Sequence, residues 1–328
     1  MNNYLFFRTD RIGDFLMSAV LIKSIKKNDK KSHITVIASR KNFFYIKTLD
    51  FIDEVFLYPE NFIKKIFFFL KLRKKSYNLI STLDGKKRSI YFSIFLKSKK
   101  KVLMTTKIFY KKVLKRFFSK IYFFDQSLSK IEEIKDVLNL CEMKFDKSDI
   151  IFLKNQKIQH NKAKLIENYI NFHFDEKWIY DHYIKKYQSI EPNIENFKSF
   201  VEKLIYKTDK NIVITTGLIN NNLIDTYLSS FKKINENIYE KDFNNKIIQV
   251  YLKINFFDLK YLIKNSNFII TCHGASTHLA SALDIKIYDI FDKSQKEFYN
   301  KWNNHMQNYN FFYRENFSDL SNKILNKL

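Results

Sequence analysis

Short apolar runs alternate with helix-like patterns along most of the 328-residue chain. In its first half, strands are expected at Tyr4 to Phe7, Ile34 to Ala38, Val55 to Tyr58 and Leu79 to Thr82, with helices at Gly13 to Lys27 and Asn42 to Leu49. Strands that alternate with helices and show few hairpin-turn signals are typical of a parallel sheet. The pattern therefore predicts an α/β fold.

The second half repeats this alternation. Its expected strands are Tyr169 to His173, Ile212 to Thr216, Ile247 to Val250, Phe268 to Thr271 and Ile285 to Ile290, and its expected helices are Asn196 to Tyr206, Leu223 to Lys232, Asp258 to Lys264, Ser276 to Leu283 and Phe317 to Leu328. A chain of this length exceeds what one core usually holds. We predict two Rossmann-like domains, residues 1–160 and 161–328, which meet in a stretch rich in Lys, Asn and Gln.

The chain is strongly basic, with 58 Lys and Arg against 34 Asp and Glu and a net charge of +24. This charge indicates either an acidic partner or surface, or a compositional bias that also leaves only four Gly and two Pro. Two segments, 63–75 and 108–118, mix Phe with Lys as helices at an anionic membrane surface do. Ordinary surface helices with an aromatic face in the core would give the same pattern.

Other features exclude several classes of protein. No apolar run approaches the roughly 20 residues that span a bilayer. Charged residues interrupt any signal-peptide core near the N-terminus, so we expect a cytoplasmic protein. Cys141 and Cys272 are far apart and form no metal-binding motif, so neither a zinc site nor a disulfide framework is indicated. Nucleic-acid-binding signatures are absent, and no nucleic-acid partner is expected.

The stretch RTDRIGDFL follows the first expected strand. Ligands bind at the carboxyl ends of strands in open α/β sheets, and Gly13 is expected to let this turn bend tightly. A carboxylate there, Asp14 above all, could accept a proton from a substrate hydroxyl. Asp14 or Asp10 could instead cap the helix, and Asp10 could share the base role or pair with Arg8 or Arg11.

A second glycine turn, Cys272-His273-Gly274-Ala275-Ser276-Thr277-His278, lies between an expected strand and a helix. The amides at such a helix N-terminus form a ready phosphate site. Ser276 and Thr277 add hydroxyl groups, and His273 and His278 could donate to a phosphate or a leaving oxygen. The alternative is that both histidines are structural.

These two stretches resemble glycosyltransferase family nine, the lipopolysaccharide heptosyltransferases. That family opens with a strand, R-x-D-x-x-G-D and a helix, and later carries a strand followed by D-[ST]-G-x-x-H-x-x-A-A-L. Here Cys272 or His273 replaces the family aspartate, and the spacing from Gly274 to His278 is one residue longer. The segment from His173 to Trp178 resembles a third family region, in which a lysine before a tryptophan contacts the donor phosphates. Lys177 matches that lysine.

The resemblance implies a GT-B architecture, in which two Rossmann-like domains face each other across a cleft. It implies an N-terminal acceptor domain and a C-terminal domain for a nucleotide-diphosphate sugar. Asp14 would be the catalytic base. The expected donor-phosphate residues are Lys177, Gly274, Ala275, Ser276, Thr277 and His278, with further donor contacts from His273, Thr216 and Gly217. The expected acceptor-side residues are Arg8, Asp10, Arg11, Gly13, Asp84, Lys86 and Lys87.

The expected activity is therefore an inverting, metal-independent transfer of a heptose-like sugar to a lipopolysaccharide-core or related glycan. No cofactor is expected besides the sugar donor. The acceptor would be an anionic glycolipid or glycan, reached by peripheral contact with the cytoplasmic face of the inner membrane. Three alternatives remain: a same-fold transferase of another sugar, a non-catalytic nucleotide-sugar-binding protein, and a nucleic-acid-binding protein that would account for the charge.

Overall fold

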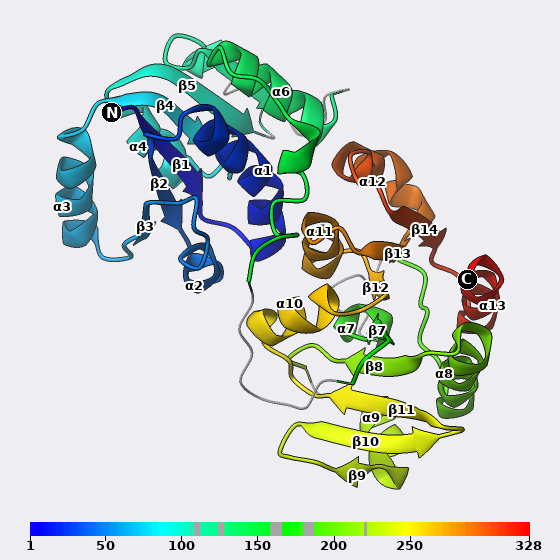
Figure 1. The fold of residues 1–328 in the computed structure, drawn as a ribbon. Coiled ribbons are helices and arrows are strands. Elements are labelled where there is room, and N and C mark those ends of the chain that lie inside the picture. The colour runs from blue at the N-terminus through cyan, green and yellow to red at the C-terminus, as the bar shows by residue number, and fades with distance from the viewer. Residues whose placement is uncertain (106, 108–111, 124–127, 158–165, 180–186, 220–221) are drawn as a thin grey trace. The chain divides into compact units, whose positions relative to one another are not determined.

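The computed structural model describes all residues except 106, 108–111, 124–127, 158–165, 180–186 and 220–221 (Figure 1). The chain forms two compact units, one of Met1–Ile150 with Asn300–His305 and one of Ile151–Tyr299 with Met306–Leu328. Our expected division at residue 160 lies in a segment outside the described residues. It did not anticipate that residues 300–305 return to the first unit.

The first unit is a parallel sheet with helices. In chain order its elements are β1 (Asn3–Arg8), α1 (Ile12–Asn28), β2 (His33–Ala38), α2 (Phe43–Ile46), β3 (Glu54–Leu57), α3 (Phe62–Arg73), β4 (Tyr77–Thr82), α4 (Lys87–Phe95), β5 (Ser98–Thr105), β6 (Lys120–Phe123), α6 (Lys130–Leu140) and η1 (Lys147–Asp149). The strand order is β3-β2-β1-β4-β5-β6, and every pair is parallel.

The central strand β1 is apolar on both faces because both are covered. Leu5 and Phe7 belong to a core cluster that also contains residues of α3 and α4. On α1 nearly every residue from Phe15 to Ile25 is buried. This helix contacts α6 and, through a 2.6 Å hydrogen bond from Ser24 to Asp149, η1. The sheet is therefore a rigid platform for the loops at its carboxyl edge.

The second unit holds the larger sheet. Its elements are β7 (Tyr169–His173), α7 (Glu176–Ile179), α8 (Ile194–Thr208), β8 (Asn211–Thr215), α9 (Asn222–Tyr227), η2 (Leu228–Ser230), β9 (Lys232–Lys233), β10 (Ile238–Phe243), β11 (Lys246–Tyr251), α10 (Phe256–Lys264), β12 (Phe268–Cys272), α11 (Ala275–Ala282), β13 (Lys286–Phe291), η3 (Lys293–Gln295), β14 (Tyr309–Tyr313) and α13 (Phe317–Lys327). The strand order is β14-β13-β12-β7-β8-β11-β10-β9. A further helix, α12 (Lys296–Asn303), begins in this unit and ends in the first.

One edge of this sheet departs from our expectation. The expected helix from Leu223 to Lys232 ends early, and the chain continues into β9 and β10. Strand β10 pairs antiparallel with β9 on one side and with β11 on the other. Asn244 and Asn245, both with positive φ, form the turn between β10 and β11. This is the hairpin chemistry that Asn favours. The remaining pairs are parallel, so two Rossmann-like sheets are confirmed.

Candidate active site

Two groups of predicted residues lie at the carboxyl edges of the two sheets, one in each unit. In the first unit they follow β1 and β4, which are neighbouring strands. In the second unit they follow β7, β8 and β12, which are also neighbours. Loops after adjacent parallel strands meet at one edge, where ligands of α/β sheets bind.

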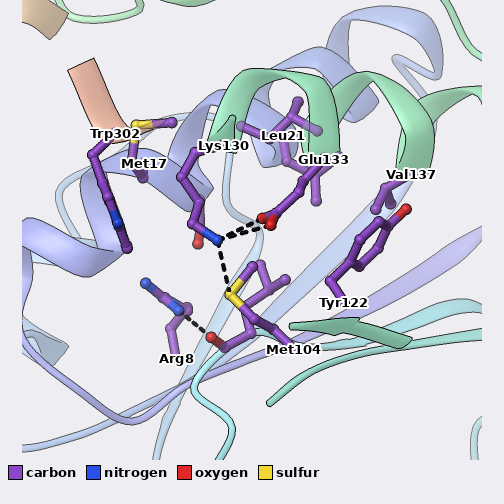
Figure 2. A pocket seen from close by; sticks show the side chains of 12 residues that line it. Arg8, Met17, Leu21, Met104, Tyr122, Lys130, Glu133, Val137 and Trp302 are labelled. Atoms are coloured by element: carbon purple, nitrogen blue, oxygen red, sulfur yellow. Dashed lines mark hydrogen bonds and ion pairs between the residues drawn. The ribbon is translucent and has the colours of Figure 1, made fainter. Parts of the chain in front are cut away.

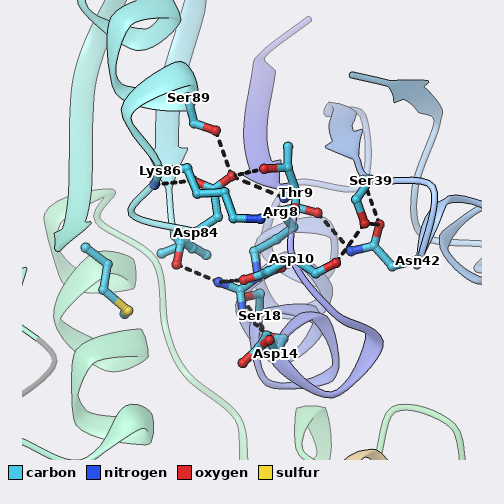
Figure 3. A network of polar contacts seen from close by, with 12 residues as sticks. Arg8, Thr9, Asp10, Asp14, Ser18, Ser39, Asn42, Asp84, Lys86 and Ser89 are labelled. Atoms are coloured by element: carbon cyan, nitrogen blue, oxygen red, sulfur yellow. Dashed lines mark hydrogen bonds and ion pairs between the residues drawn. The ribbon is translucent and has the colours of Figure 1, made fainter. Parts of the chain in front are cut away.

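Arg8 ties the turn after β1 to the end of β4 (Figure 3). Its guanidinium donates to the carbonyl oxygen of Leu83 at 2.6 Å and to that of Asp14, and it forms an ion pair with Asp10 at 3.2 Å. The side chain is almost wholly buried, and its Nε has no hydrogen-bond partner among the described residues. We expected that Asp10 could pair with Arg8 or Arg11, and the structure shows the ion pair with Arg8.

Asp10 and Asp14 differ in environment. Burial raises the pKa of Asp10 to about 6, since it outweighs the nearby Arg8 cation, and the negative charges of Asp14 and Asp84 add to the rise. Asp14 lies in the first turn of α1 and is partly exposed. Its carboxylate makes no hydrogen bond or ion pair with the described part of the chain. Neither aspartate caps the helix, because Arg11 occupies the N-cap position without a side-chain cap bond. Asp14 is thus an available proton acceptor.

Gly13 does not form the tight turn that we expected of it. Gly13 is the second residue of α1 and does not have a positive φ, so it makes no tight turn. Gly85, after β4, does have a positive φ of 59°. A Cβ on Gly85 would also lie 2.9 Å from the carbonyl oxygen of Met104. The turn that needs glycine is therefore the one after β4.

Asp84 and Lys86 hold Thr9 in place (Figure 3). Asp84 accepts hydrogen bonds from the hydroxyls of Thr9 and Ser89, and Lys86 donates to the carbonyl oxygen of Thr9. Both predicted acceptor-side residues thus support the turn after β1. The predicted Lys87 and Arg11 are exposed at the N-terminal ends of α4 and α1.

A small cavity of about 30 Å³ lies behind this turn, within the first unit (Figure 2). Lys130 and Glu133 of α6 form a buried ion pair there at 2.7 Å, and the Lys130 ammonium lies 5.3 Å from the centre of the Trp302 ring. Burial lowers the pKa of Lys130 and raises that of Glu133. Sequence reasoning missed all three residues, because residues 95–160 matched no motif of the family and Trp302 lies outside the segments that did.

In the second unit, Lys177 lies over Gly274. A Cβ on Gly274 would lie 2.8 Å from Lys177 Nζ, and the glycine φ of 172° is extended backbone that any residue adopts. The absence of a side chain at Gly274 therefore lets the lysine approach the backbone closely. The ammonium also pairs with buried Asp175 at 2.5 Å. Burial opposes its charge, yet Asp175 holds the pKa of Lys177 above its ordinary value.

The first turn of α11 is held by a buried carboxylate that we did not predict. Asp289 of β13 accepts hydrogen bonds from Thr277 Oγ1 at 2.9 Å, from Tyr309 at 2.8 Å and from His273 Nδ1 at 2.6 Å. Thr277 Oγ1 also accepts from the Gly274 amide, and Ser276 bonds to Thr271 at 2.8 Å. The hydroxyls of Ser276 and Thr277 thus serve the turn itself. The amides of the first turn lack intrahelical partners, so they are the groups of this turn that an anion could bind.

Arg314, immediately after β14, fixes the neighbouring backbone. Its guanidinium donates two 3.0 Å hydrogen bonds to the carbonyl oxygen of Lys177 and lies 3.8 Å from the Cys272 sulfur. Burial raises the pKa of the Cys272 thiol and lowers that of His173 to about 4, so both are neutral at pH 7. Cys272 is a buried contact rather than a nucleophile.

The remaining predicted donor residues lie beside these groups. Thr216 and Gly217 follow β8, and a Cβ on Gly217 would collide with the carboxylate of Glu176, next to Lys177. The ring centroids of His278 and His273 are 5.3 Å apart. Every predicted donor residue of the second unit is thus within the β7, β8 and β12 loops or the first turn of α11. Among the described residues, no three His, Cys, Asp or Glu side chains cluster as a metal site would require.

No protein-family model and no curated protein matches the sequence. Solved structures do match. Escherichia coli ADP-heptose lipopolysaccharide heptosyltransferase II aligns with a TM-score of 0.65 and 11% identity over 100% of this chain and 97% of its own. A family 9 glycosyl transferase from Veillonella parvula aligns at 0.64 and 12% over 95% and 86%. The fold is that of the GT-B glycosyltransferases.

A third similar structure is the UDP-GlcNAc 2-epimerase from Methanocaldococcus jannaschii, with a TM-score of 0.53 and 11% identity over 100% of this chain and 92% of its own. At these identities the likeness concerns the fold. The fold is therefore shared by enzymes that transfer a sugar and enzymes that epimerise one, and the site residues must decide the chemistry.

Proposed function

We propose that the protein is a glycosyltransferase that moves a sugar from a nucleotide-diphosphate donor to an acceptor hydroxyl. One observation carries the proposal: Lys177, a partly buried cation, lies against Gly274 at the first turn of α11, so a positive charge and helix N-terminal amides lie next to each other. Such a place suits a diphosphate. The GT-B fold supports transfer, as does the Asp14 carboxylate, which has no hydrogen bond or ion pair with any residue that the structure describes.

In the proposed mechanism, Asp14 accepts the proton of the acceptor hydroxyl. The hydroxyl oxygen forms a bond to the anomeric carbon as the bond from that carbon to the diphosphate oxygen breaks, with inversion. Lys177, the amides of Ala275 to Thr277 and His278 stabilise the charge on the leaving diphosphate by preorganised electrostatics. We propose that no metal takes part.

Asp10 and Arg8 have a positioning role in this scheme. Arg8 binds the carbonyl oxygen of Asp14, and Asp10 holds Arg8 by the 3.2 Å ion pair. Together they fix the backbone that carries the base. We propose a heptose-like sugar as the donor group and an anionic lipopolysaccharide-core or related glycolipid as the acceptor, on the cytoplasmic face of the inner membrane. Arg11, Lys86 and Lys87 would attract its negative groups.

The first test is thermal stability against ADP-, GDP- and UDP-linked sugars and a CMP-linked sugar. A ligand at about 100 times its Kd adds roughly 2.7 kcal/mol of stability. The donor identified in this way is then used in transfer assays. Replacing the base, Asp14→Asn, should lower turnover by about 10²–10⁴-fold, with donor affinity and melting temperature unchanged. Full activity of that variant would refute the assigned base.

A second candidate is a non-catalytic protein that binds a nucleotide sugar. It is favoured by the glycine turn, where Cys272 and His273 stand in place of the family aspartate. This candidate predicts a stability shift with a donor but no transfer and no hydrolysis. An epimerised sugar in the same assay would instead indicate an epimerase, the activity named for the third similar structure.

A further inference from the structure

Helix α3 is apolar on two opposite faces. Phe68, Phe69 and Leu72 pack into the core cluster of the first sheet. The outer face carries exposed side chains of Phe62, Ile63, Ile66, Phe67 and Leu70, whose exposed fractions run from 45% to 73%. An amphipathic surface helix normally presents polar residues on that face. The outer stripe of α3 is therefore not explained by folding.

The apolar surface continues onto α4. Phe92 of α4 packs against Phe68 and Phe69, with ring centroids 6.1 and 5.6 Å apart, so the two helices are neighbours (Figure 1). Tyr91 and Phe95 of α4 are exposed at 58% and 65%. Exposed apolar surface of this kind, rimmed by polar groups, marks an interaction site. We call these seven outer side chains the α3–α4 face.

The chain segment that forms the α3–α4 face is almost purely basic. Between residues 61 and 97 the sequence has ten Lys and Arg, and Asp84 is the only acid. Asp84 is already bound to Thr9 and Ser89. Lys64, Arg73, Lys87 and Lys97 are exposed and form no ion pair with any residue that the structure describes. The segment that carries the exposed apolar side chains thus has a large excess of positive charge.

We propose that the α3–α4 face docks the protein on an anionic lipid bilayer. The apolar side chains would enter the boundary between headgroups and acyl chains, and the lysines and arginines would meet the anionic headgroups. A second copy of the chain fits less well, because a twofold contact would place this positive face against itself. A nucleic acid fits less well, because Ile63, Ile66 and Leu70 cannot stack on bases as aromatic rings do.

This proposal differs from our expectation of two basic aromatic helices. The segment 63–75 is α3, but residues 108–111 of the second segment lie outside the described residues. The neighbour of α3 is α4, which the sequence pattern did not single out. Among the described residues no helix is long and apolar enough to cross a membrane. Docking does not depend on the proposed sugar transfer and can be measured without a substrate.

The test is flotation of the full chain with vesicles of phosphatidylcholine, with and without phosphatidylglycerol. We expect binding only to the anionic vesicles, and weaker binding at higher salt. Ile63→Glu should lower the partition coefficient at least tenfold, because it removes buried apolar area and adds a repelled charge. Ile234→Glu is the matched control, since Ile234 is an exposed isoleucine of the second unit. It should bind like the wild type.

A second pair of variants isolates the charge. Lys64→Gln with Arg73→Gln should lower anionic-vesicle binding by roughly ten- to thirtyfold, while Lys232→Gln with Lys233→Gln should have little effect. Melting temperatures check that all variants fold. Equal binding to both vesicle types, no binding to either, or wild-type binding by Ile63→Glu would overturn the proposal. Sedimentation showing a dimer that Ile63→Glu dissociates would assign the face to a second copy instead.

Discussion

Replacing Gly274 with alanine tests the placement of Lys177. The new methyl group would lie 2.8 Å from Lys177 Nζ and 3.2 Å from its Cε, so the ammonium must move. The nearest backbone atom, the Cys272 carbonyl oxygen, is 3.8 Å away and is not crowded. Because the extended backbone at Gly274 suits alanine and the displaced atom ends a flexible chain, we expect folding stability to change by less than about 1 kcal/mol.

Binding of the diphosphate should respond much more strongly. A hydrogen bond to a charged group contributes about 1.5–3 kcal/mol, so losing the lysine contact corresponds to roughly a 10- to 150-fold rise in Kd. Calorimetry with ADP and UDP on the wild type, Gly274→Ala, Lys177→Gln and the double variant measures this. If the methyl group acts only by displacing the lysine, the double variant should bind like Lys177→Gln alone.

Two results would refute this reasoning. Wild-type affinity in Gly274→Ala together with weak binding in Lys177→Gln would show that the ammonium tolerates the methyl group. Wild-type affinity in both variants would show that Lys177 does not bind the diphosphate. A further loss in the double variant would mean that the methyl group also disturbs the amides of α11.

Three other predictions follow from buried acids. The pKa of Asp10, raised from 3.8 to about 6, means that the folded state binds its proton more tightly, so this group makes stability fall as pH rises from about 4 to 6. In Asp10→Asn the change in unfolding free energy between pH 3.5 and pH 7, measured with urea, should therefore differ from that of the wild type by up to about 3 kcal/mol, because this fall is absent. Glu133→Gln removes the carboxylate that pairs with the buried Lys130 and should cost about 3–5 kcal/mol in urea unfolding, whereas Lys130→Met with Glu133→Leu should be nearly neutral. Asp289→Asn replaces one of the two oxygens that accept three hydrogen bonds by an NH2 donor and removes the negative charge. It should lower stability by at least about 2 kcal/mol and weaken ADP and UDP binding, since His273 and the α11 turn are then held less firmly.

The strands and helices that the sequence revealed best are those with strong apolar periodicity. β1, α1, β8, β12 and α11 lie close to their expected positions because their side chains are buried almost throughout. The β10 strand was missed because it lies near the sheet edge, and its side chains are mostly polar and only partly buried. The Asn244-Asn245 pair was the available signal for its hairpin.

The candidate site was predictable where it depends on local chain order. The turns after β1 and β12 bring their own residues together, and the fold places Lys177 beside the second turn. Asp289 and Arg314 reach the site only through strand pairing, which no local pattern reveals. The sequence contained one signal for Asp289, which is the single carboxylate in the apolar run Ile287 to Phe291. A buried acid in such a run requires hydrogen-bond partners.

The return of residues 300–305 to the first unit limits how this protein can be divided. A fragment that ends at residue 150 would lack Trp302, and the Lys130–Glu133 pair would lose the ring beside it. A chimera that joined this N-terminal half to the C-terminal half of another protein would place the Lys130–Glu133 pair beside residues from that other protein instead of Trp302. A chimera that keeps this contact must therefore carry residues 300–305 along with the N-terminal half.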